Sequence, residues 1–181
     1  MERETHILIN DLRNGEHTAQ QRLLAQYGQM VFRQIARIVT RQEEAEEVYQ
    51  DVLVNALRKI ETFDERQASL STWLCRIAYN ESLNFVRRTE PNIVYIDDSQ
   101  TELEDVEDMQ EADFDEHTVQ LLEQALERLR PNEQAVISMF YYDGLSLADM
   151  AYVTGTKPST IGSQLFRIRK KLYRLIKTLQ Q

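Results

Sequence analysis

The chain has 181 residues, and 21 basic against 30 acidic side chains give it a formal charge of −9. The single cysteine excludes an internal disulfide and a four-thiolate metal site, and the few glycines and prolines favour a helical fold over a strand-rich one. No apolar run approaches the roughly 18 residues that cross a membrane, and residues 1–4 lack the pattern of a signal peptide, so we expect a cytoplasmic protein.

The negative charge is concentrated in one stretch. Residues 90–116 carry 12 acidic side chains and no basic one, whereas the chain after Asp149 carries seven basic side chains and no acidic one. So acidic and weakly periodic a segment predicts a flexible linker, which we place at residues 91–117. We therefore expect an all-α fold with two small helical domains, residues 1–90 and 118–181. The basic C-terminal end is what contact with nucleic acid requires.

The first domain is predicted to contain three amphipathic helices, because apolar residues recur at steps of three and four. The helices cover residues 18–39, 45–60 and 70–88, and residues 62–69 form a loop before the third. The second helix has a polar face that is either solvated or a surface for another protein. Its residues are Glu47, Gln50, Asp51, Asn55 and Arg58.

The third predicted helix carries a polar stripe, in which Arg76, Asn80, Asn84 and Arg87 share one face. Such a stripe is common on a solvated helix, but two amides and two guanidinium groups can also hold bases or the nucleic acid backbone. Trp73, near the loop, either packs in the core or stacks on an unpaired base.

The second domain is predicted to end in a helix-turn-helix. A first helix begins near Thr118, and Pro131 begins the next. Ser146 caps a short helix that ends at Gly155, and Pro158 begins the last helix. In a helix-turn-helix of this spacing the second helix enters the major groove of DNA, although a plain helical hairpin has the same spacing.

The last predicted helix favours DNA binding over a plain hairpin. Thr160, Ser163 and Gln164 share one face with Arg167, and all four can hydrogen-bond to base edges or phosphates. Further basic residues continue this surface along an acid-free helix. They include Lys170 and Lys171.

The sequence offers little for catalysis. It has no phosphate-binding glycine loop, no histidine pair with metal-ligand spacing, and no base near Cys75 that could activate it. We therefore expect a protein without catalytic residues, metal, cofactor or small-molecule substrate.

In this order, the segments resemble the sigma factors of bacterial RNA polymerase, in particular the extracytoplasmic-function group. Residues 46–53 are similar to the motif that docks on the polymerase, and residues 63–64 with 71–80 to the promoter-melting segment. Residues 129–151 and 160–172 are similar to the domain that binds the upstream promoter element. The resemblance implies a non-catalytic factor that binds core RNA polymerase and directs promoter-specific initiation. Members of the family are often held inactive by an anti-sigma protein.

The resemblance also implies a role for each set of residues. The polar face of the second helix would bind core polymerase, and the loop before the third helix would capture a base flipped from the opened strand. Contacts with the melting region and downstream element would come from Asp64, Ser71, Trp73, Arg76, Asn80, Asn84, Arg87 and Arg88. Contacts with the upstream element would come from Lys157, Ser159, Thr160, Ser163, Gln164, Arg167, Lys170 and Lys171.

Two other functions remain open at this point. A free-standing helix-turn-helix regulator would bind an operator without polymerase, and a helical adaptor would pack its turn motif against protein only. The charge of −9 predicts that the chain alone binds promoter DNA poorly. The sequence departs from the family at Gln134 and Gln164, which stand where arginine is common.

Overall fold

The computed structural model describes residues 2–89 and 116–180, and every regular element in these residues is helical, which confirms the all-α prediction. Residues 90–115, which hold most of the predicted linker, lie outside the described residues. No described helix combines the length and the hydropathy that a membrane crossing demands. The elements are α1 (Glu2–Arg13), α2 (His17–Ala36), α3 (Gln42–Lys59), η1 (Ile60–Thr62), α4 (Leu70–Thr89), α5 (Glu116–Glu127), α6 (Pro131–Tyr141), α7 (Leu147–Thr154) and α8 (Pro158–Leu179).

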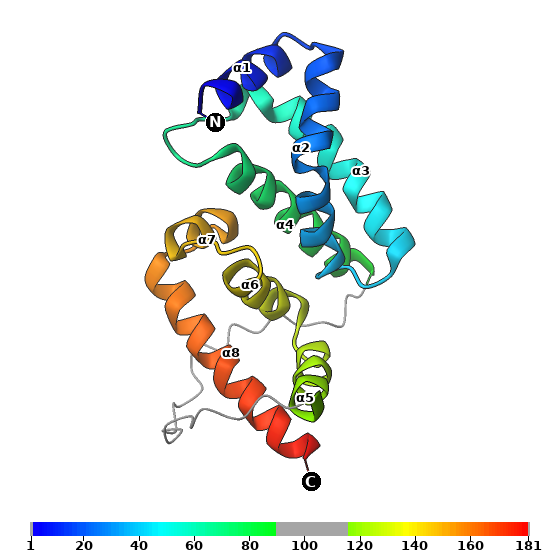
Figure 1. Cartoon of the computed structure of the whole chain (residues 1–181), viewed down its shortest axis with the longest axis vertical. Coiled ribbons are helices and arrows are strands. Elements are labelled where there is room, and N and C mark those ends of the chain that lie inside the picture. The colour runs from blue at the N-terminus through cyan, green and yellow to red at the C-terminus, as the bar shows by residue number, and fades with distance from the viewer. Residues whose placement is uncertain (1, 90–115, 181) are drawn as a thin grey trace.

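Helices α1 to α4 form one half of the elongated molecule and α5 to α8 the other (Figure 1). We call these halves the first and second unit. In the first unit α2, α3 and α4 pack against one another and confirm the three predicted helices. Gly28 lets α3 approach α2 closely, because a Cβ atom there would lie 2.6 Å from the Tyr49 hydroxyl oxygen. The large aliphatic side chains of these three helices that are fully buried are Val31, Ile35, Val48, Val52 and Leu74.

Helix α1 is an element that the periodicity of the sequence does not predict. Its buried stripe consists of Leu8, Ile9 and Leu12, and the rest of the helix is mostly polar. Three buried positions within five residues are too few to stand out as a helical pattern. In the structure this short stripe is enough to pack α1 onto α2, and α1 also contacts η1.

The second unit contains the predicted helix-turn-helix. The Ser146 hydroxyl oxygen accepts a hydrogen bond from the backbone N–H of Asp149 (3.1 Å) and so caps α7. Gly155 ends α7 with a φ of 72°, a left-handed conformation that glycine adopts without steric cost. Pro158 then begins α8, where its fixed φ suits the first turn. The first helix of this unit, α5, begins at Glu116, two residues before the predicted start.

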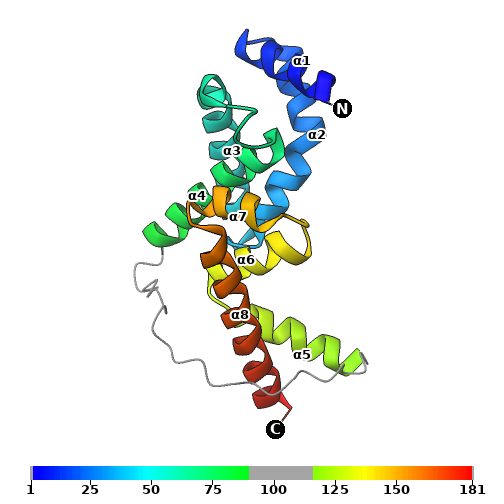
Figure 2. The same cartoon turned by 90° about the vertical axis from the view of Figure 1, so that its left-hand side faces the viewer.

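The two units lie directly against each other. Helix α7 runs along α4, and α6 contacts both α2 and α4; Figures 1 and 2 show α7 beside α4 from two sides. The sequence predicts two domains on a linker and contains no sign of this contact. One residue at this contact, Arg76 of α4, belongs to the predicted DNA-binding set, and it lies over the ring of Tyr152 in α7.

Candidate polymerase and promoter interface

Helix α3 presents the predicted polymerase-binding stripe to solvent. Its opposite face is buried in the core, so the four side chains of the stripe do not take part in holding the unit together. They are Glu47, Gln50, Asp51 and Arg58, which are all exposed. The spacing of three and four residues places them along one line of the helix.

Two further residues refine this surface. Val54 is 47% exposed and stands within the same stripe, one turn before Arg58, although it is not among the residues predicted from the sequence. An apolar side chain among exposed polar ones is the signal that marks it, because protein interfaces place apolar groups inside a polar rim. The predicted contact Asn55 points elsewhere: its amide donates a hydrogen bond to Glu81 Oε1 (2.9 Å) and links α3 to α4.

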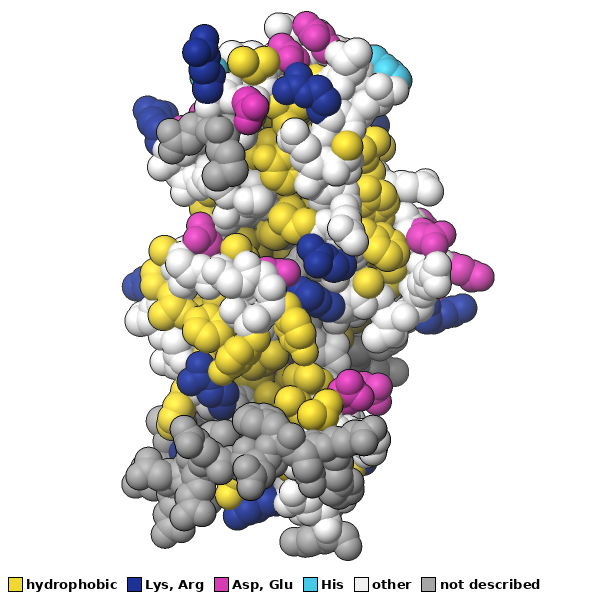
Figure 3. All heavy atoms as spheres, viewed as in Figure 1, with side chains coloured by type: hydrophobic (Ala, Val, Ile, Leu, Met, Phe, Trp, Pro, Cys, Tyr) yellow, Lys and Arg dark blue, Asp and Glu magenta, His cyan; other side chains and the backbone are white. Residues whose placement is uncertain are grey.

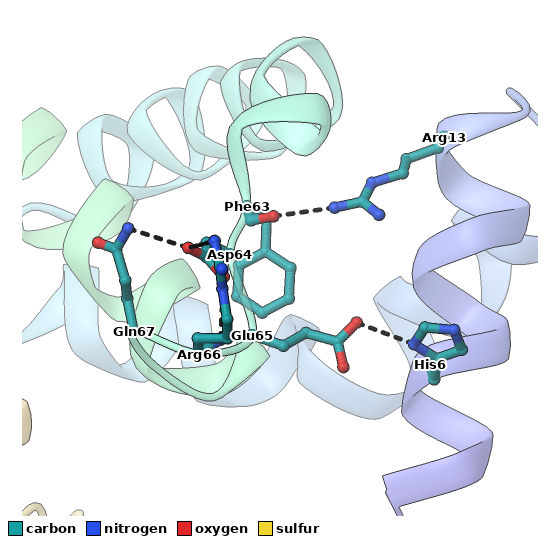
Figure 4. Close-up of polar contacts among 7 residues, drawn as sticks. All are labelled: His6, Arg13, Phe63, Asp64, Glu65, Arg66 and Gln67. Carbon is teal, nitrogen blue, oxygen red and sulfur yellow. Dashed lines mark hydrogen bonds and ion pairs between the residues drawn. The ribbon is translucent and has the colours of Figure 1, made fainter.

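The loop before α4 is held in a definite shape by Asp64. The Asp64 carboxylate accepts hydrogen bonds from the backbone N–H and the guanidinium group of Arg66, and from the side-chain amide of Gln67 (Figure 4). The hydrogen bonds from Arg66 hold the pKa of Asp64 well below its usual range. Asp64 therefore stays ionised and organises the turn at neutral pH.

The start of α4 closes the other side of the loop. The Ser69 hydroxyl lies 2.8 Å from the hydroxyls of both Ser71 and Thr72, so the predicted contact Ser71 is part of a hydroxyl cluster. Trp73 is only 7% exposed, and its ring centre lies 5.3 Å from that of Phe63. The structure thus places Trp73 in the core beneath the loop and does not offer its ring as an open platform for a base.

The polar stripe of α4 is exposed along its length, as the sequence pattern predicts. Arg76, Asn80, Asn84, Arg87 and Arg88 are all exposed. Asn80 donates its amide to the carbonyl of Arg76 (2.8 Å) and so keeps the side chain close to the helix. The Arg76 guanidinium group lies 4.8 Å from the ring centre of Tyr152, which belongs to α7 of the second unit.

The N-terminal half of α8 buries Ile161 and Leu165 in the core of its unit and turns its other face to solvent. The predicted contacts that are exposed there are Lys157, Ser159, Thr160 and Ser163. Gln164 and Arg167 follow on the same face and are partly buried. The arrangement brings a lysine, hydroxyl groups, an amide and a guanidinium group to one helix end, which is the composition that contacts phosphates and base edges.

Two predicted lysines of α8 have partners within the unit. Lys171 Nζ donates to Glu133 Oε2 (2.7 Å), and Arg130 donates to both oxygens of the same carboxylate. Burial alone would raise the pKa of Glu133, but the hydrogen bonds from Arg130 and Lys171 outweigh it and lower the pKa. Lys170 lies over the ring of Phe166, with Nζ 4.9 Å from its centre.

The space-filling view shows hydrophobic side chains gathered over α6, α7 and α8 (Figure 3). Exposed aromatic residues of this unit include Tyr141, Tyr142 and Phe166. The guanidinium carbon of Arg169 lies 5.6 Å from the Tyr141 ring centre, so part of the basic surface of α8 rests on aromatic rings. From helical spacing alone, the basic residues of α8 are predicted to face solvent and DNA. The spacing does not indicate that some of them lie over aromatic rings.

Charged and polar contacts join the two units. Arg37, which directly follows α2, pairs with Asp143, which follows α6, at 3.0 Å. The Thr72 hydroxyl donates to Asp149 Oδ1 at 3.3 Å. Cys75 is buried near Arg37 and Asp143, and burial raises the pKa of its thiol to about 12. The packing of the units therefore buries Thr72 and Cys75 of α4 and leaves the neighbouring polar stripe exposed.

Two family models match the chain: sigma-70 region 2 over residues 23–91 and sigma-70 region 4 over residues 119–172. The extracytoplasmic-function RNA polymerase sigma factor RpoE of Cereibacter sphaeroides is 32% identical over 136 residues, which are 73% of this chain and 70% of that protein. The RNA polymerase sigma-H factor of Pseudomonas aeruginosa is 25% identical over 181 residues, covering 95% of this chain and 93% of that protein. The sigma factor RpoE of Bartonella quintana, solved in complex with the anti-sigma factor NepR, has a TM-score of 0.62 at 24% identity, covering 87% of this chain and 96% of that chain.

The two matching regions correspond to the two structural units, and they follow each other in the order that the sequence motifs predict. Together they span more than half of the chain. The chain therefore belongs to the sigma factors of bacterial RNA polymerase, in the extracytoplasmic-function group.

Proposed function

We propose that this sigma factor directs promoter-specific initiation through three separate surfaces, each of which binds a different partner or promoter element. The exposed stripe of α3 binds core RNA polymerase. The loop at residues 63–69 and the stripe of α4 engage the opened downstream element, and the N-terminal half of α8 reads the upstream element. The protein itself carries no catalytic step and acts in the cytoplasm, where the polymerase is.

One observation carries this proposal. The three predicted residue sets lie on three different helices or in the segments that lead into them, and most of their members are exposed on the face opposite to the one that the core uses. Helix α3, for example, buries Val48 and Val52 while it presents Glu47 and Asp51 to solvent. A side chain that a fold does not need for its own packing can be given over to binding a partner.

The closed packing of the two units implies a change of arrangement during initiation. Thr72 and Arg76 of α4 contact α7 while the units are together. We expect core polymerase to hold the units apart, so that α4 and α8 can reach two promoter elements at once. A solved sigma factor of similar fold is bound to an anti-sigma factor, and we propose that a protein inhibitor of this kind also binds this chain.

In vitro transcription with core polymerase tests the proposal without knowledge of the promoter. A template library with randomised upstream and downstream segments is transcribed, and the transcripts are sequenced to find the preferred elements. We expect the wild-type chain to select a promoter and Asp51→Lys to lose both transcription and binding to core polymerase. Glu123→Lys, an equal charge change at an exposed position of α5, is the matched control and should keep both. If the wild-type chain selects no sequence from the library, the proposal is wrong.

A further inference from the structure

The last residue of α1, Arg13, reaches the loop that the proposed function assigns to base capture. Its Nη2 donates a hydrogen bond to the main-chain carbonyl oxygen of Phe63 (2.8 Å), although the two residues are 50 positions apart (Figure 4). Helix α1 lies outside the region 2 match, which begins at residue 23. Neither Arg13 nor any other residue of α1 belongs to the binding residues predicted from the sequence.

The position of the Phe63 carbonyl gives this contact its importance. Phe63 is the last residue before Asp64, and its ring is fixed in the core against Trp73. Its backbone N–H is bound to the carbonyl of Ile60 (3.1 Å). With the side chain and the N–H already held, the carbonyl oxygen is the remaining group that sets how the next peptide enters the loop. Arg13 holds that oxygen with a charged donor, which makes a stronger hydrogen bond than a neutral one.

A second contact joins the same helix to the same loop. His6 Nδ1 lies 3.1 Å from Glu65 Oε1, two turns before Arg13 along α1. The buried residues Leu8, Ile9 and Leu12 lie between these positions and fix α1 to the core. The loop is therefore held by the hydrogen bonds that Asp64 accepts within it, and by contacts from α1, which is itself packed on the core.

We infer that Arg13 is a positioning residue for promoter recognition: it fixes the entry of the loop at residues 63–69 in the shape that accepts an unstacked base. The inference rests on the proposed function of this loop. Because the bound carbonyl directly precedes Asp64, removal of the hydrogen bond lets the first peptide of the loop rotate. A loop whose first peptide can rotate accepts several bases where the fixed loop accepts one. Base selectivity at one downstream position is therefore the property that Arg13 controls.

A purely structural role for Arg13 would have a different effect. It would lower the stability of the first unit and reduce transcription from every promoter by the same factor. Arg22 provides the comparison, because its Nη1 binds Asp11 Oδ2 (3.2 Å) and so joins α2 to the same helix α1 without touching the loop. Arg13→Met and Arg22→Met remove the same charge. Arg22→Met breaks the contact with Asp11, and Arg13→Met breaks the hydrogen bond to Phe63 together with a long ion pair to Glu61, in which Nε and Oε2 are 4.0 Å apart.

The experiment is transcription of the randomised promoter library by core polymerase with the full-length wild-type chain, Arg13→Met, Arg13→Lys and Arg22→Met. We expect Arg13→Met to reduce the preference at one downstream position by on the order of tenfold or more, the size expected for one charge-assisted hydrogen bond. The upstream preferences should stay unchanged. Arg13→Lys should restore part of the preference, since an ammonium group can still donate to the carbonyl. Arg22→Met should keep the wild-type preference at every position.

Two results would overturn the inference. One is a wild-type base preference in Arg13→Met, and the other is an equal loss of preference in Arg13→Met and Arg22→Met. Failure of the proposed function is recognised separately, because the wild-type chain itself would then select no promoter from the library.

Discussion

Arg37 of the first unit and Asp143 of the second unit form an ion pair in which one guanidinium nitrogen, Nη1, lies 3.0 Å from both carboxylate oxygens. The same guanidinium group lies 4.9 Å from the ring centre of Tyr142. The paired side chains are 26% and 15% exposed, so water screens the pair less than it screens a surface pair. The contact thus fastens α2 to the segment that follows α6.

Breaking this pair should make the one cysteine of the chain reactive. While the units are together Cys75 is buried, and burial raises the pKa of its thiol to about 12, so almost no thiolate forms near pH 8. Separation of the units returns the pKa toward about 8.5. In Asp143→Asn we expect labelling by a thiol reagent at pH 8 to become about 5- to 30-fold faster, as the loss of about 1–2 kcal/mol from a partly buried pair implies.

Two further variants separate opening from a direct effect on the thiol. The Asp143 carboxylate raises the pKa of Cys75 and Arg37 lowers it. A direct electrostatic effect would therefore speed labelling in Asp143→Asn and slow it in Arg37→Met, whereas opening speeds labelling in both. Asp11→Asn, which breaks an ion pair within the first unit, should label at the wild-type rate. Slower labelling in Arg37→Met would contradict the prediction.

The sequence predicts the helices from α2 onward because each carries several turns of apolar periodicity or a clear end signal. Ser146 and Gly155 are examples, since the cap and the left-handed turn depend on residues that are adjacent in the chain. Helix α1 has too few apolar positions, and the packing of α7 on α4 depends on residues 77 positions apart, such as Thr72 and Asp149. Contacts of that kind leave no local pattern in one sequence.

In the candidate site too, the sequence predicts what depends on neighbouring residues and misses contacts between distant ones. The exposed stripes of α3 and α4 follow from helical spacing alone, and the structure places them at the surface as predicted. Spacing cannot tell whether an individual side chain has a partner from another helix. Asn55 binds Glu81 and Lys171 binds Glu133. Gln134, where the family commonly has arginine, donates its amide to the carbonyls of Leu126 and Leu129 and so closes the end of α5.

The stability of the second unit should fall in acid because of Glu133. Its pKa is lowered in the folded protein, so the stability it contributes is complete above the ordinary glutamate pKa of about 4.3 and is lost as the pH falls through the folded value. We expect Glu133→Gln to lower the free energy of unfolding at pH 7 by about 1–3 kcal/mol, since the hydrogen bonds from Arg130 and Lys171 lose their charged acceptor. The difference between wild type and variant should shrink below about pH 4.3.

Urea unfolding between pH 3 and pH 7 measures this difference. Glu127→Gln, a change at an exposed position of α5, serves as the control and should leave both the stability and its pH dependence close to wild type. A difference between wild type and Glu133→Gln that stays constant down to pH 3 would rule out a lowered Glu133 pKa as the source.

The close approach of α2 and α3 can be tested at Gly28. An alanine Cβ there would lie 2.6 Å from the Tyr49 hydroxyl oxygen, and the Tyr49 ring is held edge-on against Phe32 at 5.6 Å. We expect Gly28→Ala to lower the free energy of unfolding by about 1–3 kcal/mol, the usual cost of overpacking. Tyr49→Phe removes the clashing oxygen, so the double variant should be more stable than Gly28→Ala alone. Additive effects of the two changes in urea unfolding would contradict this explanation.

Arg167 and Lys171 lie one turn apart on α8, but we expect their replacement to have opposite effects. Lys171 is bound to Glu133, so Lys171→Met should lower the thermal stability of the second unit while the DNA affinity of the folded protein changes little. Arg167→Ala should weaken binding of the holoenzyme to the upstream element by about 1–3 kcal/mol if it reads a base with two hydrogen bonds.

Binding of the holoenzyme to a promoter fragment at several salt concentrations distinguishes these roles. A variant that makes one phosphate contact fewer has a salt slope smaller by about 0.9, so a change in slope identifies a contact with the backbone. We expect Lys171→Met to keep the wild-type slope, because in the structure the lysine neutralises Glu133 and holds α8 on α6. If the salt slope of Lys171→Met is smaller than that of the wild type by about 0.9, the value for one phosphate contact, Lys171 leaves Glu133 when DNA binds. Glu133 would then be paired with Arg130 alone in the complex, and Glu133→Gln should in that case raise the DNA affinity, because Lys171 would no longer have to leave a carboxylate.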